Sequence, residues 1–284
     1  MRNPNVPESL DGWNILHRMY SFNRRRYEAL DASNRTRVAA DAIEFLRPLH
    51  DDPETDVGLS QLLGDKADLM ITFYAKSFDV LGDVEIAFDR LALRDYLEPR
   101  ASFVSILELG LYEATRRIHN DLRERGLKPY SAEWNEAFDA QMRDAAEEPR
   151  NASRLWAKIP QRRYTCFYPM DKKRGEQANW YALPYDARAA LMLDHGKIGR
   201  TFHGLVTQVI SGSIGFDDYE WGVDLYTDDP IVLKRLVYEM RFDEASARYA
   251  EFGAFYSGMQ FSVDALPAFL EGNERAELLI PASM

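Results

Sequence analysis

The chain has 284 residues and a net charge of −11, from 35 basic and 46 acidic residues. No dense Lys/Arg segment stands out, and no apolar run reaches the ~18 residues of a membrane span, so we expect neither a nucleic-acid partner nor a membrane span. Cys166 is the only cysteine, which excludes an internal disulfide and a cysteine-rich zinc site. Together with an amino terminus that lacks the apolar core of a secretory signal, this predicts a cytoplasmic protein that acts on a small molecule.

The chain shows the same order of predicted elements twice. In the first half, residues 12–22 alternate as a strand does and residues 34–49 have helical spacing, while residues 64–112 indicate an acidic turn, a strand, a helix and an aromatic-rich strand. The second half repeats this order in residues 162–202 and 216–258. Each half therefore predicts the β-α-β-β-α-β order of a ferredoxin-like unit.

The expected fold class is α+β: a tandem ferredoxin-like repeat of the dimeric α+β barrel type, with antiparallel sheets and helices outside. Residues 1–112 would form a structural amino-terminal half, residues 113–160 a connecting segment with an exposed helix, and residues 161–284 the carboxy-terminal half. We expect the tail after Met259 to be a peripheral extension or an interface element.

Residues 164–172 form a predicted strand whose alternation places Tyr168, Met170 and Lys172 on one side. A phenol, a thioether and an ammonium in this order could line the wall of a cavity. Alternatively, the strand leaves the core at this end and Lys172 points into solvent. The strand pattern by itself leaves both interpretations open.

His195 lies within a helical apolar stripe that it shares with Leu191, Ile198 and Phe202, so it should face whatever the helix packs on. Such a histidine is commonly a hydrogen-bonded core residue. No cysteine or acidic cluster accompanies it, so the pattern does not suggest zinc; it suits haem iron, which takes one imidazole and an apolar slot. Gln208 follows on a strand face among apolar residues, where its amide needs a partner.

Longer motifs in the second half identify a resemblance. They are YPMDK at 168–172, NWY at 179–181, HGKIGR at 195–200, QVISGSIGFDDYEWGV at 208–223 and LVYEMRFDEASARYAEFG at 236–253. These motifs resemble the coproheme decarboxylases, the haem-synthesis branch of the chlorite dismutase-like superfamily. The resemblance is dense over residues 160–258, whereas residues 1–150 agree only in length and element order.

The resemblance implies two ferredoxin-like halves, a substrate bound in the carboxy-terminal half and assembly as a homopentamer. It implies that iron coproporphyrin III loses two propionate carboxyl groups as carbon dioxide, that two equivalents of hydrogen peroxide are consumed, and that haem b is the product. A transient contact with ferrochelatase is a further expectation for such a pathway.

Individual site residues follow from the resemblance. It implies that His195 is the proximal iron ligand, that Tyr168 becomes a radical and takes hydrogen from a propionate, and that Lys172 lies beside the reacting propionates. Gln208 falls at the distal position. The positions that hold the porphyrin carboxylates match Arg154, Met170, Arg241 and Ser246. Two family tryptophans near the site match Trp180 and Trp221.

Three alternatives stay open. Chlorite dismutases carry an arginine where this chain has Gln208, so the neutral amide disfavours chlorite chemistry or general peroxidase activity on the same scaffold. A non-catalytic haem carrier would use His195 only for docking and would need no redox phenol at Tyr168. A barrel without any cofactor would treat these residues as packing.

Overall fold

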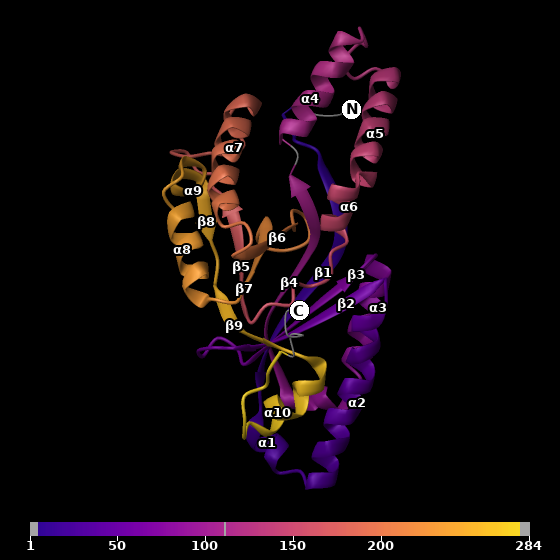
Figure 1. Ribbon diagram of the computed structural model, residues 1–284, viewed down its shortest axis with the longest axis vertical. Coiled ribbons are helices and arrows are strands. Elements are labelled where there is room, and N and C mark those ends of the chain that lie inside the picture. The colour runs from indigo at the N-terminus through magenta and orange to yellow at the C-terminus, as the bar shows by residue number, and fades with distance from the viewer. Residues whose placement is uncertain (1–4, 111, 279–284) are drawn as a thin grey trace.

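The computed structural model describes residues 5–110 and 112–278 (Figure 1). Its strands are β1 (Ser9–Phe22), β2 (Thr55–Leu62), β3 (Leu69–Ala75), β4 (Leu97–Gly110), β5 (Tyr164–Lys172), β6 (Val206–Gly212), β7 (Trp221–Thr227), β8 (Ala250–Phe252) and β9 (Tyr256–Phe261). Its α-helices are α1 (Arg24–Glu28), α2 (Ala32–Asp51), α3 (Phe78–Phe88), α4 (Tyr112–Glu124), α5 (Ala132–Glu147), α6 (Pro149–Leu155), α7 (Tyr185–Thr201), α8 (Pro230–Met240), α9 (Glu244–Tyr249) and α10 (Leu266–Glu271). Two 3-10 helices, η1 (Ala92–Tyr96) and η2 (Val263–Ala265), precede β4 and α10.

All strands described belong to one antiparallel sheet. The first half pairs in the order β4-β1-β3-β2 and the second half in the order β6-β7-β5-β9, which is the ferredoxin-like order in each case. Strand β2 pairs with β9, and β4 pairs with β6, so the two sheets close into a barrel. Strand β8 adds to the far end of β5. The tandem ferredoxin-like prediction is confirmed.

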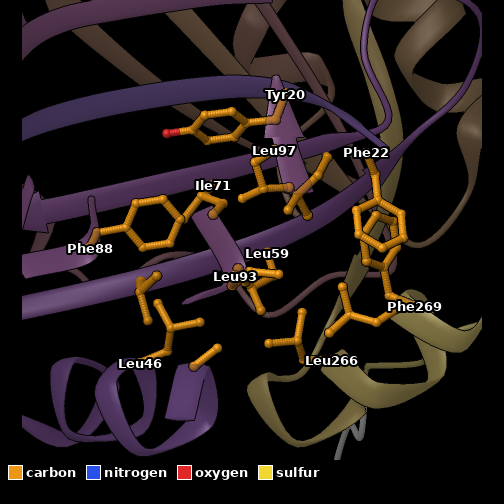
Figure 2. Packing of buried hydrophobic residues seen from close by; sticks show 14 of the residues in the cluster. Tyr20, Phe22, Leu46, Leu59, Ile71, Phe88, Leu93, Leu97, Leu266 and Phe269 are labelled. Atoms are coloured by element: carbon orange, nitrogen blue, oxygen red, sulfur yellow. The ribbon is translucent and has the colours of Figure 1, made fainter. Parts of the chain in front are cut away.

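The largest apolar core lies between the amino-terminal sheet and its helices (Figure 2). Helix α2 begins at Asp31, whose carboxylate accepts the backbone N–H of Asn34 at 2.8 Å, and it buries one apolar face on the sheet. The carboxy-terminal tail joins this core, since Phe269 of α10 packs on Phe22 and Phe261. The sequence predicted a peripheral extension or an interface element after Met259, and in the structure α10 packs into the core of the amino-terminal half.

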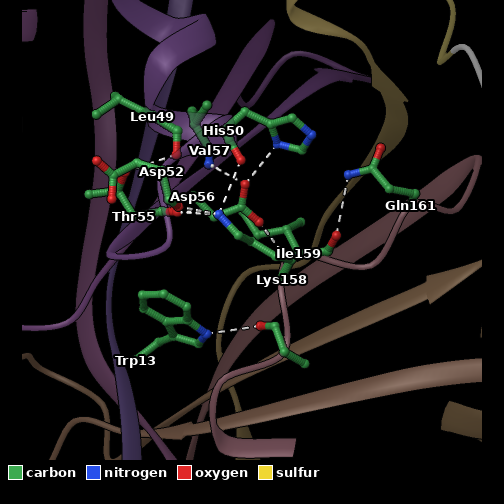
Figure 3. A network of polar contacts seen from close by, with 11 residues as sticks. Trp13, Leu49, His50, Asp52, Thr55, Asp56, Val57, Lys158, Ile159 and Gln161 are labelled. Carbon is green, nitrogen blue, oxygen red and sulfur yellow. Dashed lines mark hydrogen bonds and ion pairs between the residues drawn. The ribbon is translucent and has the colours of Figure 1, made fainter. Parts of the chain in front are cut away.

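The connecting segment is helical. Helices α4 and α5 form a hairpin beside the barrel mouth (Figure 1) with a small core of its own around Leu122, Trp134 and Phe138. Its return to the barrel is fixed by Lys158, whose Nζ donates to the carbonyl oxygens of His50, Asp52 and Thr55 (Figure 3). The end of α2 therefore holds the start of the carboxy-terminal half.

Inside the barrel, a buried hydrogen bond between an imidazole and a carboxylate joins the two halves. His17 of β1 and Asp224 of β7 are both fully buried, with Nε2 and Oδ1 3.0 Å apart. The imidazole stacks on Phe167 of β5 at 4.1 Å. The barrel interior is thus a packed core, and helices α7, α8 and α9 lie on the outside of the carboxy-terminal sheet (Figure 1). None of the helices in the described part of the chain has the length and hydropathy that crossing a bilayer requires.

Candidate active site on the outer face of the carboxy-terminal half

Strand β5 presents two different faces, as its alternation predicted. Phe167 packs inside the barrel, whereas Cys166 and Tyr168 pack outward in an apolar layer with Phe202 and Leu236, the latter from α8. Met170 lies on the same outward layer. The predicted cavity-facing side of the strand is therefore the side that faces α7 and α8.

Tyr168 is held between two aromatic rings. Its ring stacks on Phe255 with centroids 4.5 Å apart and tilts against Phe252 at 5.7 Å. Arg241, which caps α8, lies 4.7 Å over the Phe252 ring. Burial raises the pKa of Tyr168 well above its ordinary value, and the nearby Arg241 only partly opposes this. The phenol is therefore neutral at physiological pH.

Lys172 is buried, with 7% of its surface exposed. Its Nζ donates to the carbonyl oxygen of Ala245 at 3.1 Å and lies 4.6 Å from the centre of the Trp180 ring. Burial lowers the pKa of Lys172 to about 8, although the carboxylates of Asp243 and Glu220 act in the opposite direction. The interpretation in which Lys172 points into solvent is wrong; it faces the inside of the site.

His195 is oriented by a carboxylate. Its Nδ1 lies 3.0 Å from Oδ2 of Asp243 and 3.4 Å from Oγ of Ser246. Because a carboxylate only accepts hydrogen bonds, Nδ1 is the donor in this contact. In the neutral imidazole, the lone pair of Nε2 is then free for a metal, as in many metal-ligating histidines. Within residues 5–110 and 112–278, no three His, Cys, Asp or Glu side chains gather around a common metal position. The imidazole thus fits a metal that brings its other ligands with it, as an iron porphyrin does.

Asp243 was not identified from the sequence. It is the N-cap of α9, where its Oδ1 accepts the backbone N–H of Ser246 at 2.9 Å and its Oδ2 accepts the Ser246 hydroxyl at 3.0 Å. The Asp-x-x-Ser pattern after α8 signals a helix start, but nothing local connects it to His195, 48 residues earlier. Because Ala245 also holds Lys172, the short helix α9 supports the imidazole and the ammonium together.

Helix α7 and strand β6 leave apolar surface incompletely covered between them. Leu191, His195 and Ile198 form the predicted stripe of α7, yet all three remain only partly buried. On β6, Gln208 and Ile210 are partly buried as well, and the Gln208 amide donates to the Gly199 carbonyl oxygen of α7 at 3.5 Å. Gln208 of β6 therefore packs against the same helix that carries His195, and the partly covered apolar side chains of α7 and β6 form a surface of the kind that binds a flat apolar ligand.

The other predicted residues are distributed unevenly. Arg241 lies near Tyr168, and Ser246 lies beside His195, where its hydroxyl already bonds to Asp243. Arg154 is exposed on α6, and no contact between described residues joins it to this group. The indole N–H of Trp221 donates to Glu108 at 2.9 Å. Cavities of about 270 Å³ at the carboxy-terminal tail and about 180 Å³ between α4 and α7 contain none of the predicted residues.

The two ferredoxin-like halves closed into one barrel place this chain in the dimeric α+β barrel class. Its site is built around a histidine on an outer helix that is held by a carboxylate. The sequence model described as chlorite dismutase matches residues 35–261, so the chain belongs to the chlorite dismutase family. Within that family it lies with the coproheme decarboxylases, in agreement with its motifs.

Two curated relatives carry that second name. The coproheme decarboxylase of Staphylococcus saprophyticus is 39% identical over 90% of this chain and 94% of its own length. That of Staphylococcus carnosus is 38% identical over 92% of this chain and 97% of its own length.

Solved structures agree on the fold. A haem-binding protein from Thermus thermophilus superposes with a TM-score of 0.80 and 37% identity, covering 95% of this chain and 99% of its own. A variant chlorite dismutase from Candidatus Nitrospira defluvii superposes with a TM-score of 0.69 and 18% identity, covering 92% of this chain and 96% of its own. The latter likeness concerns the fold alone.

Proposed function

We propose that this chain is a coproheme decarboxylase whose substrate is iron coproporphyrin III and whose product is haem b. Two observations carry the proposal, in a chain 39% identical to a curated coproheme decarboxylase. Tyr168 and Lys172 are both buried on β5, and Lys172 and His195 are both held by neighbouring residues at the start of α9. In each of two rounds, a propionate, one proton and hydrogen peroxide give a vinyl group, carbon dioxide and two molecules of water. The propionate loses two electrons and the peroxide gains them.

Binding rests on an apolar slot with charged groups around it. His195 offers Nε2 to the iron from α7, while Gln208 faces it from β6. Arg241 and Lys172 complement the propionates of an anionic substrate in a protein that is otherwise acidic, and Arg154 is assigned the same role through the resemblance. Met170 and Ser246 complete the proposed porphyrin contacts.

Tyr168 is assigned the removal of hydrogen from the propionate side chain. The iron of the bound substrate, oxidised by peroxide, supplies the oxidising power. Since burial favours the protonated phenol, Tyr168 would give up its electron to the peroxide-oxidised substrate and its proton to the water formed from peroxide. The resulting neutral radical would regain both as a hydrogen atom from the propionate side chain, which restores the phenol. Phe252 and Phe255 pack against the ring and offer that radical no hydroxyl or amine hydrogen.

Lys172 is assigned to the propionate carboxylate. Its pKa of about 8 leaves mostly ammonium at neutral pH and lets it give up a proton at small cost. The ammonium form can pair with the reacting carboxylate and orient it. It can also donate the one proton that each round of the reaction consumes.

A titration tests the proposal. Iron coproporphyrin III is added to the purified protein, followed by measured peroxide, and the porphyrins are identified by mass spectrometry. Two successive losses of carbon dioxide with two peroxides consumed are expected, whereas an unchanged porphyrin indicates a carrier and rapid oxygen release from chlorite indicates a chlorite dismutase. The neutral Gln208 argues against the latter, because an amide stabilises an oxychlorine anion less than an arginine does.

Tyr168→Phe is the sharpest variant of this titration. It keeps the ring packing against Phe255 and should bind the substrate with an unchanged dissociation constant. Without the phenolic hydrogen, decarboxylation should fall at least ~10³-fold, the scale of losing a group that acts only in the transition state. Full turnover by this variant would remove the radical assignment.

The proposal also covers the oligomeric state of the protein, its location in the cell and the transfer of coproheme to it. We assign a homopentamer, which light scattering of the purified protein tests, and a cytoplasmic location, which cell fractionation tests. A transient ferrochelatase contact would appear as faster transfer of coproheme from ferrochelatase than from free solution.

A further inference from the structure

Glu220 is a buried carboxylate that the proposed reaction leaves without a role. It directly precedes β7 and has 7% of its surface exposed. Its Oε2 accepts the backbone N–H of Lys172 at 2.9 Å, and its own N–H donates to Oδ1 of Asp171 at 2.8 Å. This reciprocal pair of bonds ties the end of β5 to the start of β7. A buried carboxylate is costly unless it is paired, so its position requires an explanation.

The same carboxylate reaches the loop that carries Trp180. Its Oε1 lies 3.7 Å from the guanidinium of Arg174, and the Tyr181 phenol bonds to it, which together with burial raises the pKa of that phenol. Arg174 and Asn179 form a bridge that closes this loop into a short hairpin. Glu220 thus holds the strand that bears Lys172 and the hairpin whose indole lies against the Lys172 ammonium.

The charges around Lys172 come from two sides. The carboxylate of Asp243 faces it from the α9 side and that of Glu220 from the β7 side, and both favour the ammonium form. Arg174 offsets part of the Glu220 charge, but its side chain is 63% exposed and solvent screens it. Asp243 has the larger effect on the amine, but it also bonds to His195 and Ser246. Glu220 can therefore be changed without removing a bond to the imidazole.

We propose that Glu220 is a positioning residue for Lys172: it fixes the backbone and the indole beside the amine and supplies negative charge that keeps the buried amine protonated. This assignment rests on the proposed function for its meaning in catalysis. The electrostatic part concerns the ligand-free protein and can be tested without any substrate.

In the reaction, loss of the Glu220 charge would leave Lys172 as a neutral amine at a lower pH. A neutral amine neither pairs with a propionate carboxylate nor donates a proton readily. The alkaline limb of the pH profile should therefore move to lower pH in Glu220→Gln, and kcat should fall more than KM rises, since other groups still bind the substrate.

The first experiment measures the amine itself. Ligand-free protein is acetylated briefly at a series of pH values, and modification at position 172 is quantified by mass spectrometry in a Lys173→Arg background, which removes the neighbouring amine. Glu220→Gln should lower the midpoint of reactivity by about one pH unit, the low end of the effect of a nearby opposite charge. An unchanged midpoint would overturn the proposal.

Two further variants separate charge from folding. Glu220→Asp keeps the charge on a shorter side chain, so its midpoint should stay near that of the parent; a drop as large as in Glu220→Gln would refute the electrostatic role. Glu251→Gln removes an exposed charge from β8, opposite Asp171, and serves as the matched control with no expected shift.

The second experiment links the amine to turnover. Decarboxylation of coproheme is followed against pH for Glu220→Gln and its parent, and the alkaline limb should move by the same amount as the acetylation midpoint. A shifted midpoint with an unshifted turnover profile would contradict the catalytic part of the inference. If the parent itself does not decarboxylate coproheme, the proposed function fails while the acetylation result still decides the role of Glu220.

Discussion

At the scale of single residues, the site buries the amine of Lys172 in a position where an apolar side chain would give a more stable folded protein. Lys172 has a pKa of about 8 in the folded protein against an ordinary value of 10.5. Between these values the unfolded chain binds more protons than the folded one, so this residue makes the folding free energy more favourable as the pH rises from 8 to 10.5. Below a pH of about 8, the contribution of Lys172 to the folding free energy is unfavourable and no longer changes with pH.

Lys172→Met removes this dependence. The stability of the parent relative to Lys172→Met should increase by about 2 kcal/mol between about pH 7.5 and about pH 10, measured by urea denaturation of the ligand-free proteins. Lys197→Met, at an exposed lysine of α7, is the control and should show no such change. A difference that stays constant with pH would mean that Lys172 titrates normally.

The sequence predicted the outward side of β5 because strand alternation is local, and it predicted the stripe of α7 for the same reason. The sequence did not predict the roles of Asp243 and Glu220. Each contacts its partner across 48 residues, His195 in the first case and Lys172 in the second. Such contacts depend on which loops the barrel brings together, and no spacing rule contains that information.

At the scale of elements, the seam between β2 and β9 depends on close backbone approach. Gly258 lies opposite Leu62, and a Cβ at this glycine would lie 2.2 Å from the carbonyl oxygen of Gln61. Every larger residue must push the two strands apart. The seam therefore accepts only glycine at this position, although the residue lies in an ordinary strand conformation.

Gly258→Ala should destabilise the protein by about 1–3 kcal/mol, the range for overpacking of a close contact. Gly82→Ala, in α3, is the matched change, because its Cβ would meet no atom within 4 Å. That variant should gain about 0.5–1 kcal/mol from helix propensity. Urea denaturation of both variants measures these effects. Equal free energies of unfolding for the two variants would contradict the requirement for glycine at position 258.

Element order was predictable because turns, helix caps and apolar periodicity are local signals. Pairing across the seams was not, since it joins β4 to β6 and β2 to β9 over long sequence distances. The tail shows the same limit: its apolar residues indicate a partner surface, but only the closed barrel brings Phe269 against Phe22.

At the scale of the whole molecule, the two halves share a polar contact in the middle of an apolar barrel. His17 of β1 and its partner Asp224 of β7 are 207 residues apart in the sequence. Both side chains are fully buried. Removing one partner leaves the other desolvated without its hydrogen bond, whereas removing both leaves an apolar interior that can repack.

The contribution of this pair is measurable by a double-mutant cycle. His17→Phe and Asp224→Leu should each cost about 1–3 kcal/mol, while the double variant should lose far less than the sum, because it leaves no buried polar group without its partner. The exposed Asp194–Lys197 pair, 2.7 Å apart on α7, is the control and should show little coupling. Since His17 and Asp224 belong to different halves, a large coupling energy would mean that the halves stabilise one another through the barrel centre. Additive losses in the cycle, or separate unfolding transitions for the two halves in the parent, would show that they fold independently of this contact.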